Sequence, residues 1–253
     1  MAQAASAANV WVFSDRHQAL RWNGRNWIPV ARFPARYVSG AVVISRFDVW
    51  VFGQQYGFSG SAGAWHYNGQ AWARVPAARP FEDASATSAS DLWAYGATVI
   101  GHWNGTSWRT VSVRTLLPPP TTYCGPAVNG IYAVSATDAW AVGGAVCQDM
   151  PGPAVLLHYT GGAWHLAARL GRYNPLTVIP DGRGGLWIPA QGEQSPSAIL
   201  YYTHGKLTGA HLPVPGLQLV LEGAAATGRT AWAVGRRVVD HRAGIAVILI
   251  DRT

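Results

Sequence analysis

The heptapeptide HWNGTSW at residues 102–108 is the most informative stretch of the sequence, because it is one copy of a motif that recurs along the chain. Related copies are RWNGRNW at 21–27, HYNGQAW at 66–72, HYTGGAW at 158–164 and a more distant YTHGKLT at 202–208. A single stretch with two Trp, one His and one Asn would suggest a sugar-binding site. Recurrence at regular intervals instead favours a structural role.

A second motif precedes these copies, as in DVWVFG at 48, DLWAYG at 91 and DAWAVG at 138. Its six tryptophans are 39 to 47 residues apart: Trp11, Trp50, Trp93, Trp140, Trp187 and Trp232. Repeats of this length, each with four short apolar segments, predict the blades of a β-propeller. We therefore expect an all-β, six-bladed β-propeller of four-stranded antiparallel blades in a single domain, 1–253. The predicted blades are about 1–33, 34–78, 79–121, 122–170, 171–214 and 215–253.

The repeats resemble bacterial β-propeller repeats of the Asp-x-Trp-Ala-x-Gly type. Asn-Gly-x-x-Trp also resembles the Asp-box hairpin of sialidase-like propellers, but it is shorter and has Asn where that box has Asp. The resemblance covers essentially the whole chain. It implies a fold and no particular activity, because propellers serve as lectins, hydrolases, lyases, sensors and scaffolds.

The Asn-Gly pair inside the first motif predicts a two-residue type I′ hairpin turn. With Asn104 and Gly105 as the turn, Trp103 and Trp108 lie diagonally on one face of the blade, within reach of each other. Because the same rings recur in each repeat, we expect them to pack between neighbouring sheets. A sugar-binding platform is the alternative.

Two further sets of polar residues recur with the repeat: His66, His102 and His158, and Asp48, Asp91 and Asp138. Equivalent positions in different blades are too far apart to share a metal ion, so the histidines are expected to make structural hydrogen bonds. The aspartates follow Ser-rich turns and are expected to tighten them by bonding backbone amides. No metal site and no cofactor are predicted.

The two cysteines, Cys124 and Cys147, flank a predicted hairpin. Its strands are 127–134 and 138–145, joined by the turn SATD. This register places both thiols on one side and nearly opposite each other, as a disulfide requires. A disulfide would indicate an oxidising compartment. The alternative is two unrelated buried thiols.

The formal net charge is +7, and Lys206 is the single lysine among 19 basic residues. The arginines are scattered along the chain, whereas a nucleic-acid-binding protein concentrates them in a stripe. Nucleic-acid binding is therefore not predicted. No apolar run approaches 18 residues, so no membrane insertion is predicted. The first ten residues, MAQAASAANV, lack the charged and apolar regions of a signal peptide.

The two ends of the chain predict an unusual closure. The sixth repeat has strands at 230–235 and 244–250 and no residues for a fourth strand, while the first repeat has only MAQAA for its innermost strand. We expect either that the chain is cut from a longer protein or that its sixth blade is incomplete. The protein is expected to be a monomer.

The long connections are predicted to share one end of the blades. In a four-stranded meander, connections between strands 2 and 3 and between blades emerge at one end, here called the long-loop end. Turns 1–2 and 3–4 emerge at the opposite, tight-turn end. The long segments are 54–63, 112–126, 144–153, 191–197 and 236–244. Binding residues concentrate on such loops, and the candidates are Arg16, His17, Tyr56, Phe58, Tyr123, Asp149, Arg172, Tyr173, Glu193, Arg236, Arg237, Asp240 and His241.

Exposed aromatic rings beside Arg, Asp and His suit a glycan, a cell-wall polymer or a protein. The leading hypothesis is a non-catalytic binding domain of an extracellular or cell-surface protein. The alternatives are a structural or sensory module and a propeller hydrolase or lyase. For an enzyme, Glu193 with Asp149 is the one carboxylate pair to propose, and His241 or His17 with Tyr123 would serve a lyase. No common nucleophile, zinc or phosphate-binding motif occurs.

Overall fold

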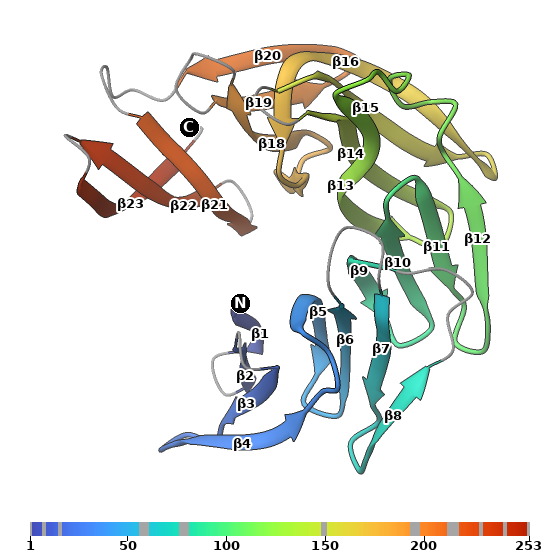
Figure 1. Cartoon of the computed structure of the whole chain (residues 1–253), viewed down its shortest axis with the longest axis vertical. Helices are drawn as coiled ribbons and strands as arrows, with labels where there is room; N and C mark the ends of the chain where they lie inside the picture. Colours follow the sequence, from blue (N-terminus) through green and yellow to red (C-terminus); the bar gives the residue numbers. More distant parts are fainter. Residues whose placement is uncertain are drawn as a thin grey trace. The chain divides into compact units, whose positions relative to one another are not determined.

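The computed structural model describes residues 2–6, 9–14, 17–55, 61–75, 81–147, 151–192, 198–211, 218–227, 230–239 and 242–251. The chain divides into two compact units, Met1–Val111 and Ser112–Thr253. The regular elements of the described residues are all β-strands (Figure 1). The all-β prediction is therefore confirmed, while the single domain and its blade boundaries stay predictions.

The first unit contains three four-stranded antiparallel sheets, each a meander that corresponds to one sequence repeat (Figure 1). Blade 1 consists of β1 (Ala2–Ser6), β2 (Asn9–Phe13), β3 (Gln18–Trp22) and β4 (Trp27–Arg32). Blade 2 consists of β5 (Tyr37–Ser45), β6 (Asp48–Gln54), β7 (Ser61–Tyr67) and β8 (Trp72–Val75). Blade 3 consists of β9 (Asp83–Ser88), β10 (Asp91–Gly96), β11 (Val99–Trp103) and β12 (Trp108–Ser112).

The second unit contains an eight-stranded and a three-stranded sheet. The larger sheet holds blade 4, which is β13 (Cys124–Ser135), β14 (Asp138–Cys147), β15 (Pro153–Thr160) and β16 (Ala163–Pro175). It also holds blade 5, which is β17 (Ile179–Pro180), β18 (Leu186–Gly192), β19 (Ala198–Thr203) and β20 (Lys206–His211). Blade 6 has three strands within the described residues: β21 (Gln218–Thr227), β22 (Thr230–Val239) and β23 (Arg242–Asp251).

One strand joins blades 4 and 5 into a single sheet. Strand β16 pairs with β15 up to Arg172 and then pairs with β18 from Tyr173 to Pro175. The outer strand of one blade thus continues into the inner region of the next without a loop. The sequence did not predict this shared strand.

The second strand of blade 3 lies at the centre of its core. All six residues of β10, DLWAYG, are buried, as a strand covered on both faces requires. The motif tryptophan of this strand pairs directly with the motif histidine of the third strand, as Trp93 does with His102. Blade 2 repeats this register with Trp50 and His66.

The hairpin turn between the third and fourth strands is centred one residue later than predicted. In blade 1 the N–H of Asn23 donates to the carbonyl of Asn26, 3.2 Å away, so Gly24 and Arg25 are the central residues. Gly24 has φ +94°, the positive value that a type II′ turn needs at this position. The Asn23 side chain stands beside the turn and accepts the N–H groups of Arg25 and Asn26 at 2.9 and 2.7 Å. Its role as acceptor explains the shift.

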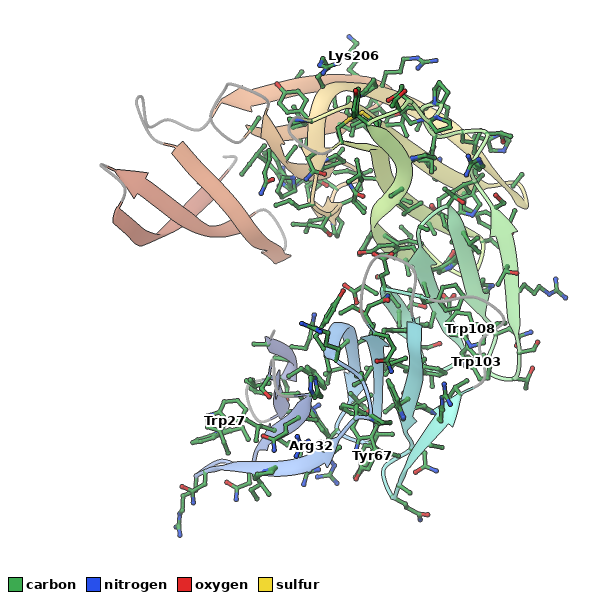
Figure 2. All side chains as sticks on the ribbon, viewed as in Figure 1. Trp27, Arg32, Tyr67, Trp103, Trp108 and Lys206 are labelled. Atoms are coloured by element: carbon green, nitrogen blue, oxygen red, sulfur yellow. A yellow bond between two sulfur atoms is a disulfide. The ribbon has the colours of Figure 1, made fainter. Side chains whose placement is uncertain are left out.

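The shifted turn brings the two rings of each hairpin directly opposite each other instead of diagonally, as for Trp22 and Trp27. The prediction that these rings meet is confirmed. Their centroids are 5.4 Å apart in Trp22–Trp27, 5.3 Å in Tyr67–Trp72, 5.7 Å in Trp103–Trp108 (Figure 2) and 5.5 Å in Tyr159–Trp164.

The paired rings pack between neighbouring sheets, as predicted. Within the first unit, Trp103 and Trp108 of blade 3 lie 5.4 and 5.9 Å from the ring of Trp50 in blade 2. In the same way, Tyr67 and Trp72 of blade 2 lie 6.0 and 6.2 Å from the ring of Trp11 in blade 1. The rings of the blade 2 and blade 3 hairpins therefore contact the second-strand tryptophan of the preceding blade.

The inner strands of adjacent blades also approach closely. In the first unit, a β-bulge in β5 precedes Gly40, and a Cβ on Gly40 would lie 2.5 Å from the Cα of Asp83 in β9. In the second unit, a Cβ on Gly130 would lie 2.7 Å from the Cα of Thr177. Both glycines are required because a side chain would occupy the backbone of the next blade.

Candidate ligand-binding site

Seven of the predicted site residues lie outside the described residues: Arg16, Tyr56, Phe58, Asp149, Glu193, Asp240 and His241. Their roles stay predictions, including the proposed pair of Glu193 with Asp149. The structure does describe His17, Tyr123, Arg172 and Tyr173, and it describes the backbone of Arg236 and Arg237.

Arg236 and Arg237 do not lie in a long loop, so that part of the prediction is wrong. Strand β22 continues to Val239, and β23 begins at Arg242. Within this ladder the two arginines pair with residues 245 and 244 of β23. The two valines that follow them favour an extended strand, and they outweigh the charge pattern that suggested a loop.

Tyr173 and Arg172 were predicted to lie on the long-loop face, and the structure places both in strand β16. Tyr173 pairs with Gly192 of β18 and packs, partly buried, against the apolar core of the second unit. The strand shared between blades 4 and 5 runs through this position, and a ligand-binding role for the two residues stays a prediction.

At the long-loop end of blade 4, the β13–β14 hairpin extends beyond its pairing with β15. The last pair between β14 and β15 is Gly144 with Ala154. Strands β13 and β14 continue past it and end with Cys124 paired to Cys147. Both strands are longer than the predicted 127–134 and 138–145. A two-stranded ribbon is only marginally stable by itself, so this extension needs additional support.

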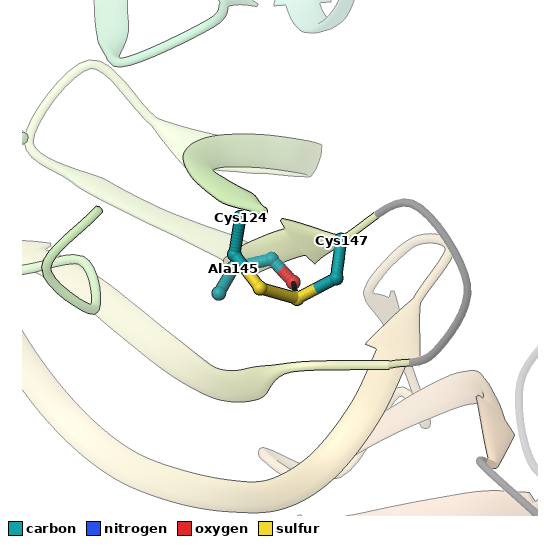
Figure 3. Close-up of a disulfide and its surroundings, with 3 residues drawn as sticks. All are labelled: Cys124, Ala145 and Cys147. Carbon is teal, nitrogen blue, oxygen red and sulfur yellow. Dashed lines mark hydrogen bonds between the residues drawn. A yellow bond between two sulfur atoms is a disulfide. The ribbon is translucent and has the colours of Figure 1, made fainter. Parts of the chain in front are cut away.

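The disulfide between Cys124 and Cys147 supplies that support and confirms the sequence prediction (Figure 3). The two Cα atoms are 4.1 Å apart, as expected for directly opposed residues of antiparallel strands. Gly152 packs against this ribbon, because a Cβ on it would lie 2.6 Å from the Cβ of Ala145.

Tyr123 precedes the disulfide and is 71% exposed, the highest value among the large apolar side chains of the described residues. A backbone hydrogen bond of 2.9 Å from Thr121 N–H to the Cys124 carbonyl closes the turn around it. Val146 on the partner strand is also exposed, and the space beside the Cα of Gly125 is open. The ribbon end thus presents an aromatic ring and an aliphatic side chain on a cross-linked backbone.

His17 lies at the long-loop end of blade 1, between β2 and β3, as the sequence predicted. Its backbone has φ +61°, an uncommon value for a residue with a side chain. Hydrogen bonds hold it there, from its N–H to Ser14 at 3.1 Å and from Phe33 N–H to its carbonyl at 2.9 Å. The ring Nδ1 is buried and has no hydrogen-bond partner among the described residues.

The recurring histidines make structural hydrogen bonds, as predicted, and their partners are the recurring aspartates. The Nε2–Oδ1 distances are 2.9 Å for His66–Asp48, 2.8 Å for His102–Asp91 and 2.9 Å for His158–Asp138. Each imidazole also stacks on the motif tryptophan of its own blade, at centroid distances of 4.4, 4.2 and 3.7 Å.

The predicted role of the aspartates is corrected accordingly. Serine hydroxyls cap the tight turns instead, as Ser45 Oγ does by accepting the N–H of Phe47 at 3.1 Å. Ser135 does the same for Thr137 at 3.2 Å. The aspartates accept from histidine because the register places the imidazole beside the start of the second strand. Matching His and Asp repeat by repeat would have identified this pair from the sequence.

Blade 5 has the same arrangement with different residues, which the sequence analysis missed. Tyr201 pairs with Trp187 at the position of the histidine, and its hydroxyl donates to Asp181 Oδ2 at 2.6 Å. Asp181 Oδ1 accepts the N–H groups of Arg183 and Gly185 at 2.7 and 2.8 Å. Burial alone would raise the pKa of Asp181, but these hydrogen bonds and the Arg183 charge outweigh it and lower the pKa.

Asp83, at the inner-strand junction of blades 2 and 3, was also missed. Burial raises its pKa to about 7, and hydrogen bonds from the N–H groups of Ala84 and Ala41 oppose that rise only in part. The neighbouring Tyr95 has a pKa raised well above its ordinary value by burial and by the charges of Asp83 and Glu82. The pattern of the sequence marks β9 as a strand and gives no indication that this carboxyl lies against another blade.

Among the residues that the structure describes, no three His, Cys, Asp or Glu side chains gather as metal ligands would. In that same part of the chain, no helix is long and apolar enough to cross a membrane. The prediction that the protein has neither a metal nor a cofactor stays a prediction.

Comparisons with known proteins identify relatives by structure alone, since neither a family model nor a curated protein sequence matches the chain. The six-bladed propeller of the fungal lectin from Aleuria aurantia, described with its fucose recognition, matches 98% of this chain and 93% of the lectin, at TM-score 0.56 and 12% identity. YCF48 bound to a D1 peptide matches over 93% of this chain and 74% of its own, at TM-score 0.60 and 13% identity.

A third similar structure is the GH74 enzyme of Niastella koreensis, at TM-score 0.66 and 11% identity. The match covers 98% of this chain and 43% of the enzyme, so this chain spans less than half of that protein. At these identities the likeness concerns the fold. Together with the antiparallel four-stranded sheets, it establishes that the chain has a β-propeller fold.

Proposed function

We propose that the protein is a non-catalytic binding domain that holds a glycan at the long-loop end of blade 4. The observation that carries the proposal is the cross-linked ribbon end with the exposed ring of Tyr123. Aromatic rings held at low conformational cost are effective recognition groups, and large exposed apolar side chains on a rigid scaffold are typical of interaction sites.

The disulfide supports this role because it holds the ring where a free two-stranded ribbon would move. Pre-ordering a binding group reduces the entropy that is lost when a ligand binds. The disulfide also favours an extracellular or cell-surface location, where such bonds persist. The similar lectin from Aleuria aurantia recognises fucose, which makes glycans the first ligand class to test here.

The test is a binding screen of the purified protein against glycans and cell-wall polymers, with each hit measured by calorimetry. Tyr123→Ala is expected to weaken binding of a true ligand about tenfold or more, because it removes the exposed ring. The matched control is Phe47→Ala, which removes a ring that is 50% exposed at the tight-turn end of blade 2. The control is expected to leave the affinity unchanged.

Replacing both Cys124 and Cys147 by Ala tests the contribution of the disulfide while the Tyr123 ring is retained. We expect this variant to bind more weakly than the native protein and to retain its fold. Equal affinities of native protein, Tyr123→Ala and Phe47→Ala would exclude the ribbon end as the site. A folded protein that binds none of the glycans or polymers would instead favour a structural or sensory module. Cleavage of a bound glycan would favour a hydrolase or lyase.

A further inference from the structure

The turn that joins β11 to β12 has a property that the other hairpin turns lack. Its residues Asn104, Gly105 and Thr106 form the only Asn-x-Ser/Thr sequence in the chain. The same turn in blades 1 and 2 begins with Asn23 and Asn68, but its third residue is Arg or Gln. One of three equivalent turns therefore carries the acceptor sequence for N-linked glycosylation.

The geometry of this turn leaves the reacting atom accessible. Asn104 Oδ1 accepts the N–H and the hydroxyl of Thr106 at 3.0 and 2.9 Å, and the N–H of Ser107 at 2.9 Å. Because N–H donors require an acceptor, these bonds identify the atom as oxygen and leave Nδ2 outside this network. Residues 104 to 107 are all exposed. The amide nitrogen therefore stands at the surface of a well-ordered turn.

We infer that Asn104 is an acceptor site for an N-linked glycan. The donor is a lipid diphosphate-linked oligosaccharide, supplied with its transferase by the export pathway. Asn104 Nδ2 forms the bond to the anomeric carbon, the bond from that carbon to the diphosphate oxygen breaks, and the diphosphate leaves with the electron pair. The amide proton passes to a base of the transferase.

Two features of the protein agree with this assignment. The Cys124–Cys147 disulfide indicates maturation in an oxidising compartment, which proteins reach by export. The turn lies at the tight-turn end of blade 3, so a glycan there points away from the long-loop end of the same blade. The inference does not depend on the ligand proposed for Tyr123.

The experiment is an intact-mass measurement on the protein secreted from cells that hold an Asn-x-Thr-specific oligosaccharyltransferase. We expect a mass increase of one glycan, which enzymatic deglycosylation removes while converting the Asn104 amide to a carboxyl group. Asn104→Gln and Thr106→Ala are each expected to lose the whole increase. Gln70→Thr, which places the same three residues at the equivalent turn of blade 2, is expected to carry two glycans.

Two results would overturn the assignment. The first is an unmodified native protein, whether or not the Gln70→Thr variant is modified at Asn68. The second is a mass increase that survives Asn104→Gln, since the glycan would then lie elsewhere. Tryptophan fluorescence of each variant verifies that the sheets have formed, so loss of the glycan cannot be confused with loss of the fold.

Discussion

Asp83 at the junction of blades 2 and 3 and Asp181 in blade 5 are both withdrawn from water, yet their pKa values move in opposite directions. Asp181 accepts two backbone N–H groups and a tyrosine hydroxyl, and it lies near the charge of Arg183. Asp83 has two backbone donors and no positive charge among the influences on its pKa. Burial and the groups that face a carboxyl therefore act in opposite directions, and the balance between them decides whether the pKa rises or falls.

The largest expected effect comes from Asp181→Ala, which removes the acceptor of three donors at a site only 7% exposed. Leaving those donors unsatisfied is expected to lower the free energy of unfolding by about 3–5 kcal/mol. The measurement is urea unfolding followed by tryptophan fluorescence. Asp138→Ala is the control, because that side chain is 42% exposed and its single bond to His158 is worth about 1 kcal/mol or less. Equal losses for the two variants would contradict the comparison.

Asp83→Asn is expected to stabilise the protein at alkaline pH. Between pH 3.8 and about 7 the folded protein holds a proton on Asp83 that the unfolded chain has released, so native stability falls as pH rises through this range and is constant above it. The neutral amide avoids this loss. At pH 8 the gain in the free energy of unfolding can reach about 4 kcal/mol, which corresponds to a roughly thousandfold difference in proton affinity between the folded and unfolded states. The gain disappears near pH 4.

The check on Asp83→Asn is a series of urea unfolding curves from pH 4 to pH 8 for native protein and variant. The sign is opposite for Asp181, whose stabilising contribution is present above its unfolded pKa and is lost as pH falls through the lowered folded value. A variant with the same pH profile as native protein would show that Asp83 is not the group that titrates.

Gly40→Ala tests the contact between blades 2 and 3 from the β5 side. The added Cβ would lie 2.5 Å from the Asp83 Cα, so β5 and β9 must separate. We expect a loss of about 1–3 kcal/mol in the free energy of unfolding. Gly125→Ala is the control, since no atom lies within 4 Å of its added Cβ. A thermal melt of both variants is sufficient, and a neutral Gly40→Ala would mean that the two strands are less close than described.

Tyr201→Phe has the smallest expected effect. It keeps the ring beside Trp187 and removes only the hydroxyl that donates to Asp181. Two backbone donors remain on the carboxylate, so the expected loss is about 1 kcal/mol. The measurement is urea unfolding at pH 7. A loss as large as that of Asp181→Ala would mean that the hydroxyl, and not the backbone amides, provides most of the stabilisation.

Much of this fold can be predicted from the sequence because the residues that determine it recur at regular intervals. The spacing of the motif tryptophans predicts the sheets, and the ring pairs predict the packing between them, since both depend on the strand period and repeat length alone. Cys124 and Cys147 were predicted to bond because a hairpin register fixes which residues face each other. Tyr123 was correctly placed in an exposed loop for a similar reason, as it precedes the first strand of its blade.

The remaining features depend on contacts that the repeat pattern does not contain. The position of the turn follows from the Asn23 side chain, which accepts two backbone N–H groups. The Asn-Gly pair is compatible with either turn position, so the sequence alone does not distinguish them. Tyr173 lies in a strand because β16 pairs with β15 before this residue and with β18 from this residue onward. The raised pKa of Asp83 depends on the backbone of another blade, which only the packed structure brings near.

The shared strand β16 has a consequence for how such a chain can evolve. A repeat protein lengthens by duplication of the gene segment for one repeat, provided that the segment encodes a unit that packs against its neighbours through its own edges. Duplicating repeat 4 or repeat 5 alone would cut the coding sequence of a strand that both blades use. Blades 4 and 5 are therefore expected to be copied or lost together, as a heritable pair of repeats.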